Sequence, residues 1–216
     1  VDFAAYDLFV LKRRGAEADY TETEVAAAKA RLAAKSEAEV AELERNLIDW
    51  LPARDFAYTR DSFRDMLGLY SEIGVEDLRA NLVEFLSEIT PVAEEEGARL
   101  CIHADDPSFP IFGLPRVMST ADDVRKMFAA VPQEACGLTL CTGSFGSNTR
   151  NDLVAMANEF GPRIHFVHLR NVTHEADGSF YEADHLGGDT DLIGVAAAIL
   201  TEEERRRVIV AAAAVA

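Results

Sequence analysis

The runs RLCIH (99–103), GLTLC (137–141) and RIHFVH (163–168) decide the fold, because each is a short apolar segment that ends on a potential metal ligand. Each run is rich in Leu, Ile, Val or Phe and opens into a loop that holds Gly, Pro, Asp or Asn. These features are typical of buried parallel strands. We therefore expect three strands whose last side chains point toward the same end of one sheet.

The segments between these runs have the pattern of helices, at about 119–131 and 151–160. Strands that alternate with helices indicate parallel βαβ units, whose functional residues gather beyond the carboxyl ends of the strands. A chain of 216 residues that is 49% hydrophobic can bury a sizeable core. We expect a single α/β domain over residues 1–216, with its chemistry at that end of the sheet.

The charge balance argues against whole classes of partner. Lys and Arg number 21 against 38 for Asp and Glu, a formal net charge of −17, so binding to nucleic-acid phosphates or to an anionic membrane is disfavoured. No apolar run reaches the roughly 18 residues of a membrane span, and the start VDFAAYDLFVLKRRG lacks the pattern of a signal peptide. The three cysteines are an odd number, which suits a reducing compartment. We expect a cytoplasmic protein.

The amino-terminal part has a different pattern from the strand-rich part. Residues 3–11 are aromatic and aliphatic without clean alternation, which fits a strand or a packed extended segment. Thr21 and Glu24 form a capping-box signature at the head of a long helix, about 22–48, with a break near Ser36. Its Ala content and many charges are typical of a helix that lies on a surface, and the charged side most simply faces solvent.

Two further helices are predicted before the first strand, at about 59–69 and 75–96. The second has a clear apolar stripe, with Pro91 bending or splitting it near its end and Gly97 stopping it. We expect residues 20–70 to form a helical insertion or cap on the domain. Such an exposed arm could also pair subunits as a homo-oligomer.

The loop at 104–116 holds three of the seven prolines of the chain. This composition stiffens a loop and lets it form the wall of a pocket. Asp105 and Asp106 fit either of two roles, capping the turn before Pro107 or supporting a metal ligand.

The loop after Cys141, TGSFGSNTRND, offers backbone donors at Gly143, Ser144 and Gly146. Such donors are suited to holding a carboxylate or hydroxyl groups. The loop lacks the glycine spacing and the lysine of a Walker motif, so it does not indicate nucleotide binding.

The strand-end ligands favour a metal site. Because side chains alternate along a strand, His165 points away from the face of His168, and we interpret His165 as structural. A single buried Cys commonly acts as a small hydrophobe and a single His as a satisfied polar residue. Three successive strand ends that each carry such a group instead favour a site made of His103, Cys141 and His168. Imidazole and thiolate ligands favour zinc or ferrous iron over magnesium or calcium.

A fourth ligand is still needed, and the segment SFYEADHLGGDTD (179–191) lies just beyond the third strand. It could supply this ligand, supply an acid and a base, or be a plain surface loop. The candidates in it are Glu182, Asp184, His185 and Asp189.

Several of these segments, in this order and spacing, closely resemble the mannonate dehydratase family. They are CIHADDPSFPIFGLPR (101–116), GLTLCTGSFGSNTRNDL (137–153), RIHFVHLRN (163–171) and GSFYEADHLGGDTD (178–191), and the early DLFVLKRRGAEADY (7–20) is similar too. The clear match covers about residues 1–20 and 97–193, and its motifs are specific enough that chance is a poor explanation.

The resemblance implies a (β/α)8 TIM-type barrel of the sugar-isomerase kind with a divalent iron or manganese ion. It also implies a hydro-lyase that removes water from D-mannonate to give 2-keto-3-deoxy-D-gluconate, in hexuronate (glucuronate) catabolism. The partner is then a small sugar acid. Carried over residue by residue, His103, Cys141 and His168 match the metal ligands of the family.

The sequence departs from the family pattern in two places. Ala104 stands where the family usually has Pro. The Arg-Pro-Asp-His-Gly segment that supplies the fourth metal ligand and neighbouring catalytic groups has no counterpart, because after Asp191 the chain runs through a predicted helix and ends. We expect the barrel to be seen incompletely, and the alternative is a truncated, inactive barrel.

The chemistry of a dehydratase assigns roles to further residues. Arg170 is our candidate for the substrate carboxylate, because a planar guanidinium matches it bidentately, although an ion pair at the rim of the barrel is an equal alternative. Asn171 and Ser144 are the other predicted substrate-binding residues, and His185 and Tyr181 are candidates for acid and base. Thiolate ligation favours iron over manganese.

Two other classes of function fit parts of the sequence. One is a metal-dependent sugar isomerase on the same barrel, which would move a hydrogen between carbons and expel no water. The other is a non-catalytic acidic helical module, which the net charge and the Ala-rich arm suggest. The second predicts no bound metal and no effect of His168→Ala.

Overall fold

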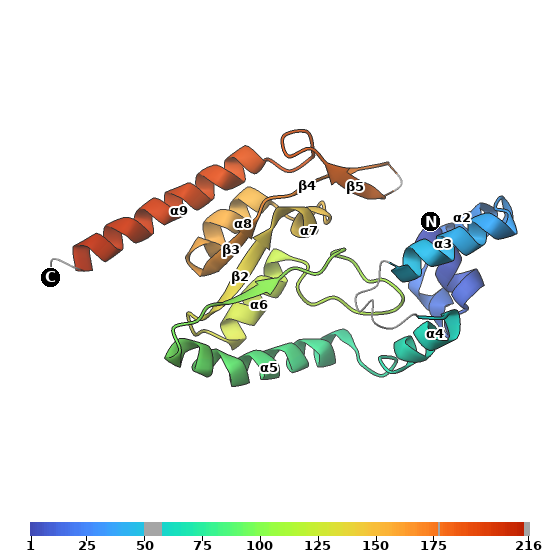
Figure 1. Cartoon of the computed structure of the whole chain (residues 1–216), viewed down its shortest axis with the longest axis horizontal. Helices are drawn as coiled ribbons and strands as arrows, with labels where there is room; N and C mark the ends of the chain where they lie inside the picture. The colour runs from blue at the N-terminus through green and yellow to red at the C-terminus, as the bar shows by residue number, and fades with distance from the viewer. Residues whose placement is uncertain (50–57, 177, 214–216) are drawn as a thin grey trace. The chain divides into compact units, whose positions relative to one another are not determined.

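The computed structural model describes residues 1–49, 58–176 and 178–213. The chain divides into two compact units, whose elements are labelled in Figure 1. The helical unit consists of residues 1–74 and 110–115, and the sheet unit of residues 75–109 and 116–216. The expected single domain with a cap at about 20–70 stays a prediction.

A three-stranded parallel sheet lies in the sheet unit, in the order β1-β2-β3. Its strands are β1 (Leu100–His103), β2 (Cys136–Cys141) and β3 (Ile164–His168). The register pairs His103 with Thr139 and Cys141 with His168. The prediction of three parallel strands is therefore confirmed, and their carboxyl ends meet at one end of the sheet.

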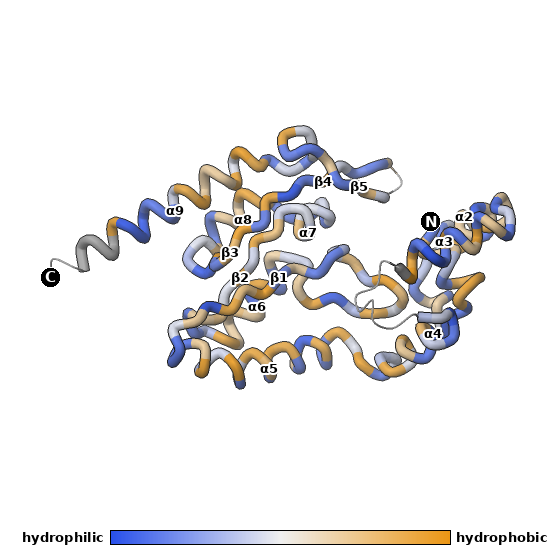
Figure 2. The backbone as a smooth tube through the Cα atoms, in the orientation of Figure 1, coloured by the Kyte–Doolittle hydropathy of each residue, from blue (hydrophilic) through white to orange (hydrophobic). Residues whose placement is uncertain are grey.

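Helices of the sheet unit build one core with this sheet. They are α5 (Val75–Glu95), α6 (Ala121–Ala130), α8 (Leu153–Phe160) and α9 (Leu192–Ala213). Leu138 and Leu140 of β2 are fully buried in a cluster with Met127 and Phe160. Figure 2 shows hydrophobic residues running through β1 and recurring along α5. Since burying one such side chain contributes about 1.5–3 kcal/mol, this core fixes the register of the strands.

On the other face of the sheet, the two outer strands are open to solvent in the part of the chain that is described, while β2 between them is buried. Cys101 and His103 on β1 are exposed, as are Phe166 and His168 on β3. Their neighbours in the sequence face the core, as the alternation of a strand requires. The side chains of His103 and His168 therefore stand on the exposed face, while Cys141 on the central strand is buried.

The helices predicted around the sheet are confirmed with shifted ends. Those expected at 75–96, 119–131 and 151–160 are α5, α6 and α8, and the helix expected after Asp191 is α9. Helix α5 continues through Pro91 and is followed by Gly97 at φ +64°, a left-handed conformation that favours glycine.

Two elements near the strand ends have no counterpart in the sequence prediction. Helix α7 (Thr142–Gly146) starts directly after β2, within the stretch expected to be a loop. Strands β4 (Asn171–His174) and β5 (Phe180–Ala183) form an antiparallel hairpin in which Val172 pairs with Glu182. A 3-10 turn, η3 (Gly161–Arg163), leads into β3.

The helical unit contains only helices as regular elements in its described residues. They are α1 (Asp2–Ala5), the π-helix η1 (Tyr6–Leu11), the 3-10 helix η2 (Ala16–Asp19), α2 (Glu22–Ala33), α3 (Glu37–Asp49) and α4 (Arg60–Gly68). The expected strand or extended segment at 3–11 is therefore wrong. Tyr6, Val10 and Leu11 are buried four and five positions apart, a helical spacing, and the described part of this unit offers no strand to pair with.

The predicted break in the long amino-terminal helix is confirmed. Helix α2 begins with the capping box of Thr21 and Glu24, in which the Thr21 side chain accepts from the Glu24 N–H at 3.3 Å. Ser36 starts α3 with a second reciprocal pair, to Glu39. Residues 50–57 of the predicted cap lie outside the described residues.

The tip of the proline-rich loop at 104–116 belongs to the helical unit. Phe112 is buried there and makes edge-to-face contacts with Phe3, Tyr6 and Phe63, at centroid distances of 5.3–6.1 Å. Phe112 has φ +51°, which is costly for an aromatic residue, so the surrounding rings must hold it.

Within the described ranges, every helix is too short or too polar to pass through a bilayer.

Candidate metal centre and active site

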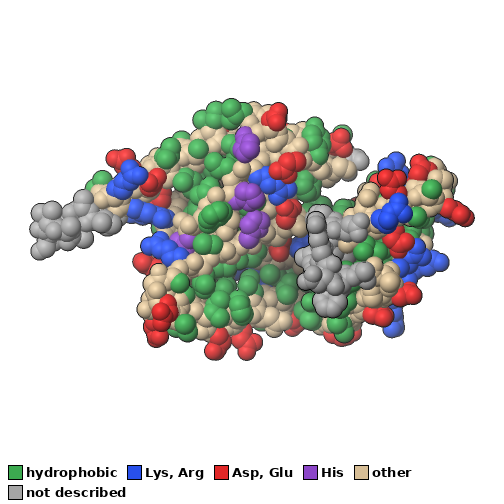
Figure 3. Space-filling view, viewed as in Figure 1, with side chains coloured by type: hydrophobic (Ala, Val, Ile, Leu, Met, Phe, Trp, Pro, Cys, Tyr) green, Lys and Arg blue, Asp and Glu red, His purple; other side chains and the backbone are tan. Residues whose placement is uncertain are grey.

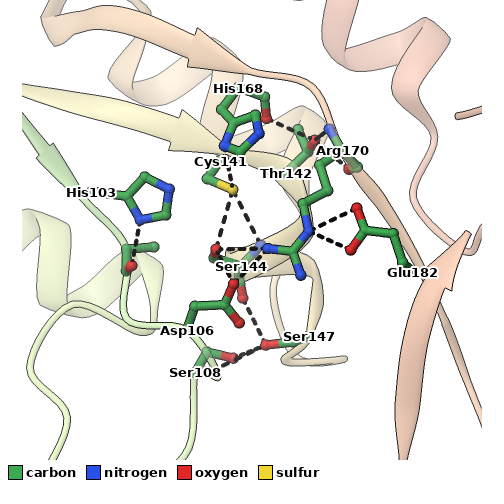
Figure 4. A network of polar contacts seen from close by, with 11 residues as sticks. His103, Asp106, Ser108, Cys141, Thr142, Ser144, Ser147, His168, Arg170 and Glu182 are labelled. Atoms are coloured by element: carbon green, nitrogen blue, oxygen red, sulfur yellow. Dashed lines mark hydrogen bonds and ion pairs between the residues drawn. The ribbon is translucent and has the colours of Figure 1, made fainter. Parts of the chain in front are cut away.

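His103, Cys141 and His168 come together at the end of the sheet. Each offers one ligand atom, and these atoms lie within 4.8 Å of one another. Cys141 Sγ is 3.4 Å from His168 Nδ1, and the two imidazole rings are 6.0 Å apart between centroids. Figure 4 shows the three side chains at the ends of their strands, and Figure 3 shows histidine side chains gathered on one exposed face. Parallel pairing thus brings together residues that are 27 to 65 positions apart in the sequence.

Local hydrogen bonds orient two of the three ligands. His103 Nδ1 lies 2.7 Å from the carbonyl oxygen of Ala104, which can only accept, so Nδ1 carries the hydrogen and Nε2 keeps its lone pair for a metal. Cys141 Sγ accepts from the N–H of Ser144 at 3.4 Å and lies 3.2 Å from the Ser144 hydroxyl. These contacts hold the sulfur in place at the start of α7.

The donor set fits a first-row divalent ion. For metal–nitrogen and metal–sulfur bonds of about 2.0 and 2.3 Å, a tetrahedral pair of ligand atoms lies about 3.5 Å apart. The 3.4 Å between Cys141 Sγ and His168 Nδ1 is close to this value. Two nitrogen donors and one sulfur suit zinc or iron better than magnesium or calcium.

None of the four candidate fourth ligands joins this cluster in the described part of the chain. Glu182 pairs with Arg170, and Asp189 pairs with His174 at 2.9 Å. Asp184 and His185 are exposed on the loop that follows β5. The cluster in the described residues therefore consists of three candidate ligands, the number of protein ligands that is common in catalytic metal sites.

Arg170 lies beside the three candidate ligands and between two carboxylates. Its Nη1 donates to Asp106 Oδ2 at 2.5 Å, and its Nε lies 2.8 and 3.0 Å from the two carboxylate oxygens of Glu182. Burial by itself lowers the pKa of Arg170, but the hydrogen bonds to Asp106 and Glu182 outweigh it and raise the pKa above its usual value. Arg170 is thus a fixed cation at the strand ends, and both roles considered from the sequence remain compatible with this geometry.

Gly143 leaves the space that the Arg170 side chain occupies. A Cβ on Gly143 would lie 2.6–2.8 Å from Cγ, Cδ and Nε of Arg170, closer than real contacts allow. Thr142 fixes the backbone of the arginine from the same helix: its hydroxyl accepts from the Arg170 N–H at 2.9 Å and donates to the Arg170 carbonyl at 2.6 Å. Helix α7 therefore positions Arg170.

The two aspartates after His103 have different roles. Asp105 Oδ2 accepts from the backbone N–H groups of Val117 and Met118 at 2.9 and 2.7 Å, so it ties the two ends of the loop at 104–116 together. Asp106 binds Arg170 and accepts from the hydroxyl of Ser144 at 3.2 Å. Asp106 therefore reaches Cys141 through Ser144, as a support for the ligands requires.

A buried pair of serines joins this loop to α7. Ser147 donates its single hydroxyl hydrogen to the carbonyl of Ser144 at 2.7 Å. The Ser108 hydroxyl, 2.7 Å from Ser147 Oγ, must then be the donor of that contact, and the Ser108 N–H donates to the same oxygen at 3.2 Å. Sequence patterns gave no signal for Ser108, Thr142 or Ser147, because hydroxyl residues in loops are common.

Of the predicted substrate-binding residues, Ser144 lies at the cluster but Asn171 does not offer a free group. The Asn171 amide donates to the carbonyls of His185 and Thr190 at 2.8 and 3.0 Å. Its oxygen accepts from the N–H groups of Val172 and Thr190, both at 3.0 Å. All four positions of this buried amide are used by the chain itself, so the geometry supports a role in holding the loop after β5 and not a contact to substrate.

The predicted acid and base stand on the hairpin and the loop after it. Tyr181 on β5 is 55% exposed, and the His185 side chain is exposed while its carbonyl holds Asn171. Both stay predictions. His165 donates from Nδ1 to the carbonyl of Leu100 at 3.0 Å, and burial lowers its pKa, which agrees with the structural role inferred from the alternation.

Comparisons with known proteins agree with the motifs. The family model described as D-mannonate dehydratase (UxuA) matches residues 4–213. A mannonate dehydratase of Saccharophagus degradans is 55% identical over 199 residues, and mannonate dehydratase 2 of Agrobacterium fabrum is 52% identical over 199 residues. Each alignment covers 92% of this chain and 50% of the relative, so the chain spans about half the length of these relatives.

A solved structure agrees as well. The crystal structure of mannonate dehydratase from Streptococcus suis serotype 2 superposes with a TM-score of 0.64 at 35% sequence identity, covering 69% of this chain and 44% of that one. The α/β class is therefore established, while the described residues contain three strands of a parallel sheet and not a complete barrel. The sequence motifs, the strand-end cluster and the match over residues 4–213 lead to one conclusion: the chain belongs to the D-mannonate dehydratase (UxuA) family.

Proposed function

We propose that the polypeptide carrying this chain dehydrates D-mannonate to 2-keto-3-deoxy-D-gluconate with a divalent metal ion. One observation carries the proposal: the ligand atoms of His103, Cys141 and His168 lie within 4.8 Å of one another, beside the guanidinium of Arg170. A metal and a fixed cation side by side suit a substrate that carries a carboxylate next to hydroxyl groups.

Dehydration of a 2,3-dihydroxy acid removes a poorly acidic proton next to the carboxylate and protonates the departing hydroxyl. The metal ion, when bound, stabilises the negative charge that develops on the substrate oxygens. Arg170 would hold the substrate carboxylate, and the buried Ser144 would support this site through its contacts to Asp106 and Cys141. Tyr181 and His185 are our candidates for moving the two protons.

We further propose iron as the resident metal, because a cysteine thiolate matches iron better than manganese. We also propose that the protein works in the cytoplasm. The three cysteines are free thiols, which fits this reducing compartment. We also propose that the complete polypeptide closes a (β/α)8 barrel, since β1 and β3 are edge strands of a parallel sheet in the described residues.

The test is incubation of D-mannonate with the polypeptide as the cell makes it, purified without oxygen. The product is followed as a 2-keto acid, and iron and manganese are measured by elemental analysis. We expect a 2-keto acid and about one metal ion per chain. His103→Ala should lose both, because it removes one of three ligands.

The matched control is His165→Gln on β3. His165 lies outside the cluster, and a Gln amide can still donate to the Leu100 carbonyl, so metal content and activity should be kept. Protein without metal and without 2-keto acid would refute the proposal. Formation of a ketose from an aldose would instead support the sugar isomerase.

A further inference from the structure

The ion pairs of Arg170 are unequal. Asp106 is 33% exposed in its side chain and also accepts the Ser144 hydroxyl, so it is built into the network around Cys141. The Glu182 side chain is 63% exposed, and among the described residues it forms hydrogen bonds to Arg170 alone. Because exposed ion pairs contribute little to stability, the contact to Glu182 is the weaker one of the two.

The guanidinium also has an unused donor. Arg170 Nε donates to both carboxylate oxygens of Glu182. Arg170 Nη2 makes no hydrogen bond within the part of the chain that the structure describes. A carboxylate that binds side-on places one oxygen on Nε and the other on Nη2, which is the stronger arrangement. Glu182 therefore occupies the carboxylate-binding edge of Arg170 without filling it (Figure 4).

We propose that Glu182 is an internal substitute for the substrate carboxylate, and that an aldonate binds by exchanging its own carboxylate for that of Glu182 on Arg170. This inference rests on the proposed function, since it assigns the substrate acid group to Arg170. It makes Glu182 a specificity-determining residue, because a neutral sugar has no group that replaces the lost ion pair.

The exchange requires only a side-chain rotation. The backbone of Glu182 is paired with Val172 in the hairpin, and Asn171 holds the start of the same hairpin through its backbone contacts. The exposed side chain has room to turn into solvent. Arg170 stays in place during the exchange, because Thr142 holds its backbone and Asp106 its Nη1.

The charge count predicts the direction of the effect. Asp106 and Glu182 carry two negative charges against one positive charge on Arg170, so these three side chains have a net charge of −1 before an aldonate binds. Glu182→Gln removes the competitor and one negative charge with little change in shape. The variant should bind an aldonate about two- to fivefold more tightly.

The experiment is calorimetric titration of D-gluconate, with its neutral counterpart D-glucitol, into the metal-loaded full-length protein. For Glu182→Gln we expect two- to fivefold tighter binding of D-gluconate and unchanged binding of D-glucitol. Asp184→Asn removes the same charge two positions away and should leave both unchanged. In an Arg170→Gln background, the addition of Glu182→Gln should bring no gain.

Equal or weaker binding of D-gluconate by Glu182→Gln would overturn the inference, as would a gain that persists without Arg170. These outcomes are measured as binding affinities and do not require catalytic turnover. A protein that shows the Arg170-dependent gain but forms no 2-keto acid from D-mannonate would therefore refute the proposed function and leave the exchange standing.

Discussion

The end of the parallel sheet and the hairpin region beyond it (residues 171–191) hold their polar side chains in different ways. At the sheet end, three strands deliver His103, Cys141 and His168 to within 4.8 Å of one another. In the hairpin region, Tyr181 and His185 are exposed, and the buried amide of Asn171 is used up by backbone groups.

The difference teaches what fixes each site residue. At the sheet end, the register and the buried core behind it determine where each ligand lies, so no single hydrogen bond decides the geometry. In the hairpin region, individual hydrogen bonds from Asn171 and between His174 and Asp189 determine the position of the loop. We therefore expect single polar substitutions to affect the hairpin region strongly and the sheet end weakly.

Asn171→Ala gives the largest effect that this contrast predicts. The substitution removes four hydrogen bonds of a buried amide and leaves backbone groups of His185 and Thr190 without their partner. Because an unsatisfied buried polar group costs about 1–3 kcal/mol, we expect a loss of about 2–3 kcal/mol in unfolding free energy. Chemical denaturation measures the loss, and hydrogen exchange should locate it at residues 180–191.

Asn158→Ala is the matched control for this variant. Asn158 lies on α8, is exposed, and makes one hydrogen bond, to the Val154 carbonyl at 2.9 Å. Its removal should cost less than about 0.5 kcal/mol. Equal costs for the two variants would show that the hairpin region does not depend on Asn171.

The sheet end could be predicted from the sequence because three constraints act together there. Apolar runs mark the strands, the alternation of side chains separates His168 from His165, and parallel pairing brings the carboxyl ends together. The structure agrees with the sequence in all three strands. The roles of the ligands themselves rest on the family resemblance and on the tests proposed above.

The hairpin region could not be predicted, because exposed polar segments carry no periodic signal. Glu182 follows directly after Tyr181 in the sequence, and nothing in the sequence separates their roles. The antiparallel register of β5 with β4 is what brings Glu182 to Arg170. The prediction for the amino-terminal segment at 3–11 was wrong for a related reason. Its apolar residues fit several local structures, and only their packing inside the helical unit selects a π-helix.

Gly143→Ala tests the place where the two regions meet, the side chain of Arg170. A Cβ at this position would lie 2.6–2.8 Å from three atoms of the arginine, so Arg170 must shift away from the strand ends. If Arg170 holds the substrate carboxylate, the affinity for D-mannonate should fall about tenfold, or about 1.4 kcal/mol, with the metal content unchanged. Steady-state kinetics and elemental analysis measure the two quantities.

The control here is Gly187→Ala, where the new Cβ would meet Asp184 Cβ at an ordinary 3.5 Å. This variant should keep its affinity for D-mannonate. Unchanged affinity in Gly143→Ala as well would assign Arg170 to an ion pair at the rim, the alternative that the sequence left open.

The smallest effect that we predict is a loss of amide protection at low pH. It should occur in the hairpin region and not in the parallel sheet. The backbone N–H of His174, and then its side chain, bind the Asp189 carboxylate and hold its pKa below the usual value of 3.8. A lowered pKa means that the contact contributes its stability above the unfolded pKa and loses it as pH falls through the folded pKa. Below about pH 4, amide protons of β4 and β5 should therefore lose protection, after correction for intrinsic exchange, while those of β2 keep theirs. Asp189→Asn, whose side-chain oxygen can still accept from the His174 N–H, should remove this pH dependence. If β2 lost protection together with the hairpin, the two regions would unfold as one unit. The contrast between them would then hold for the positions of their side chains but not for their stability.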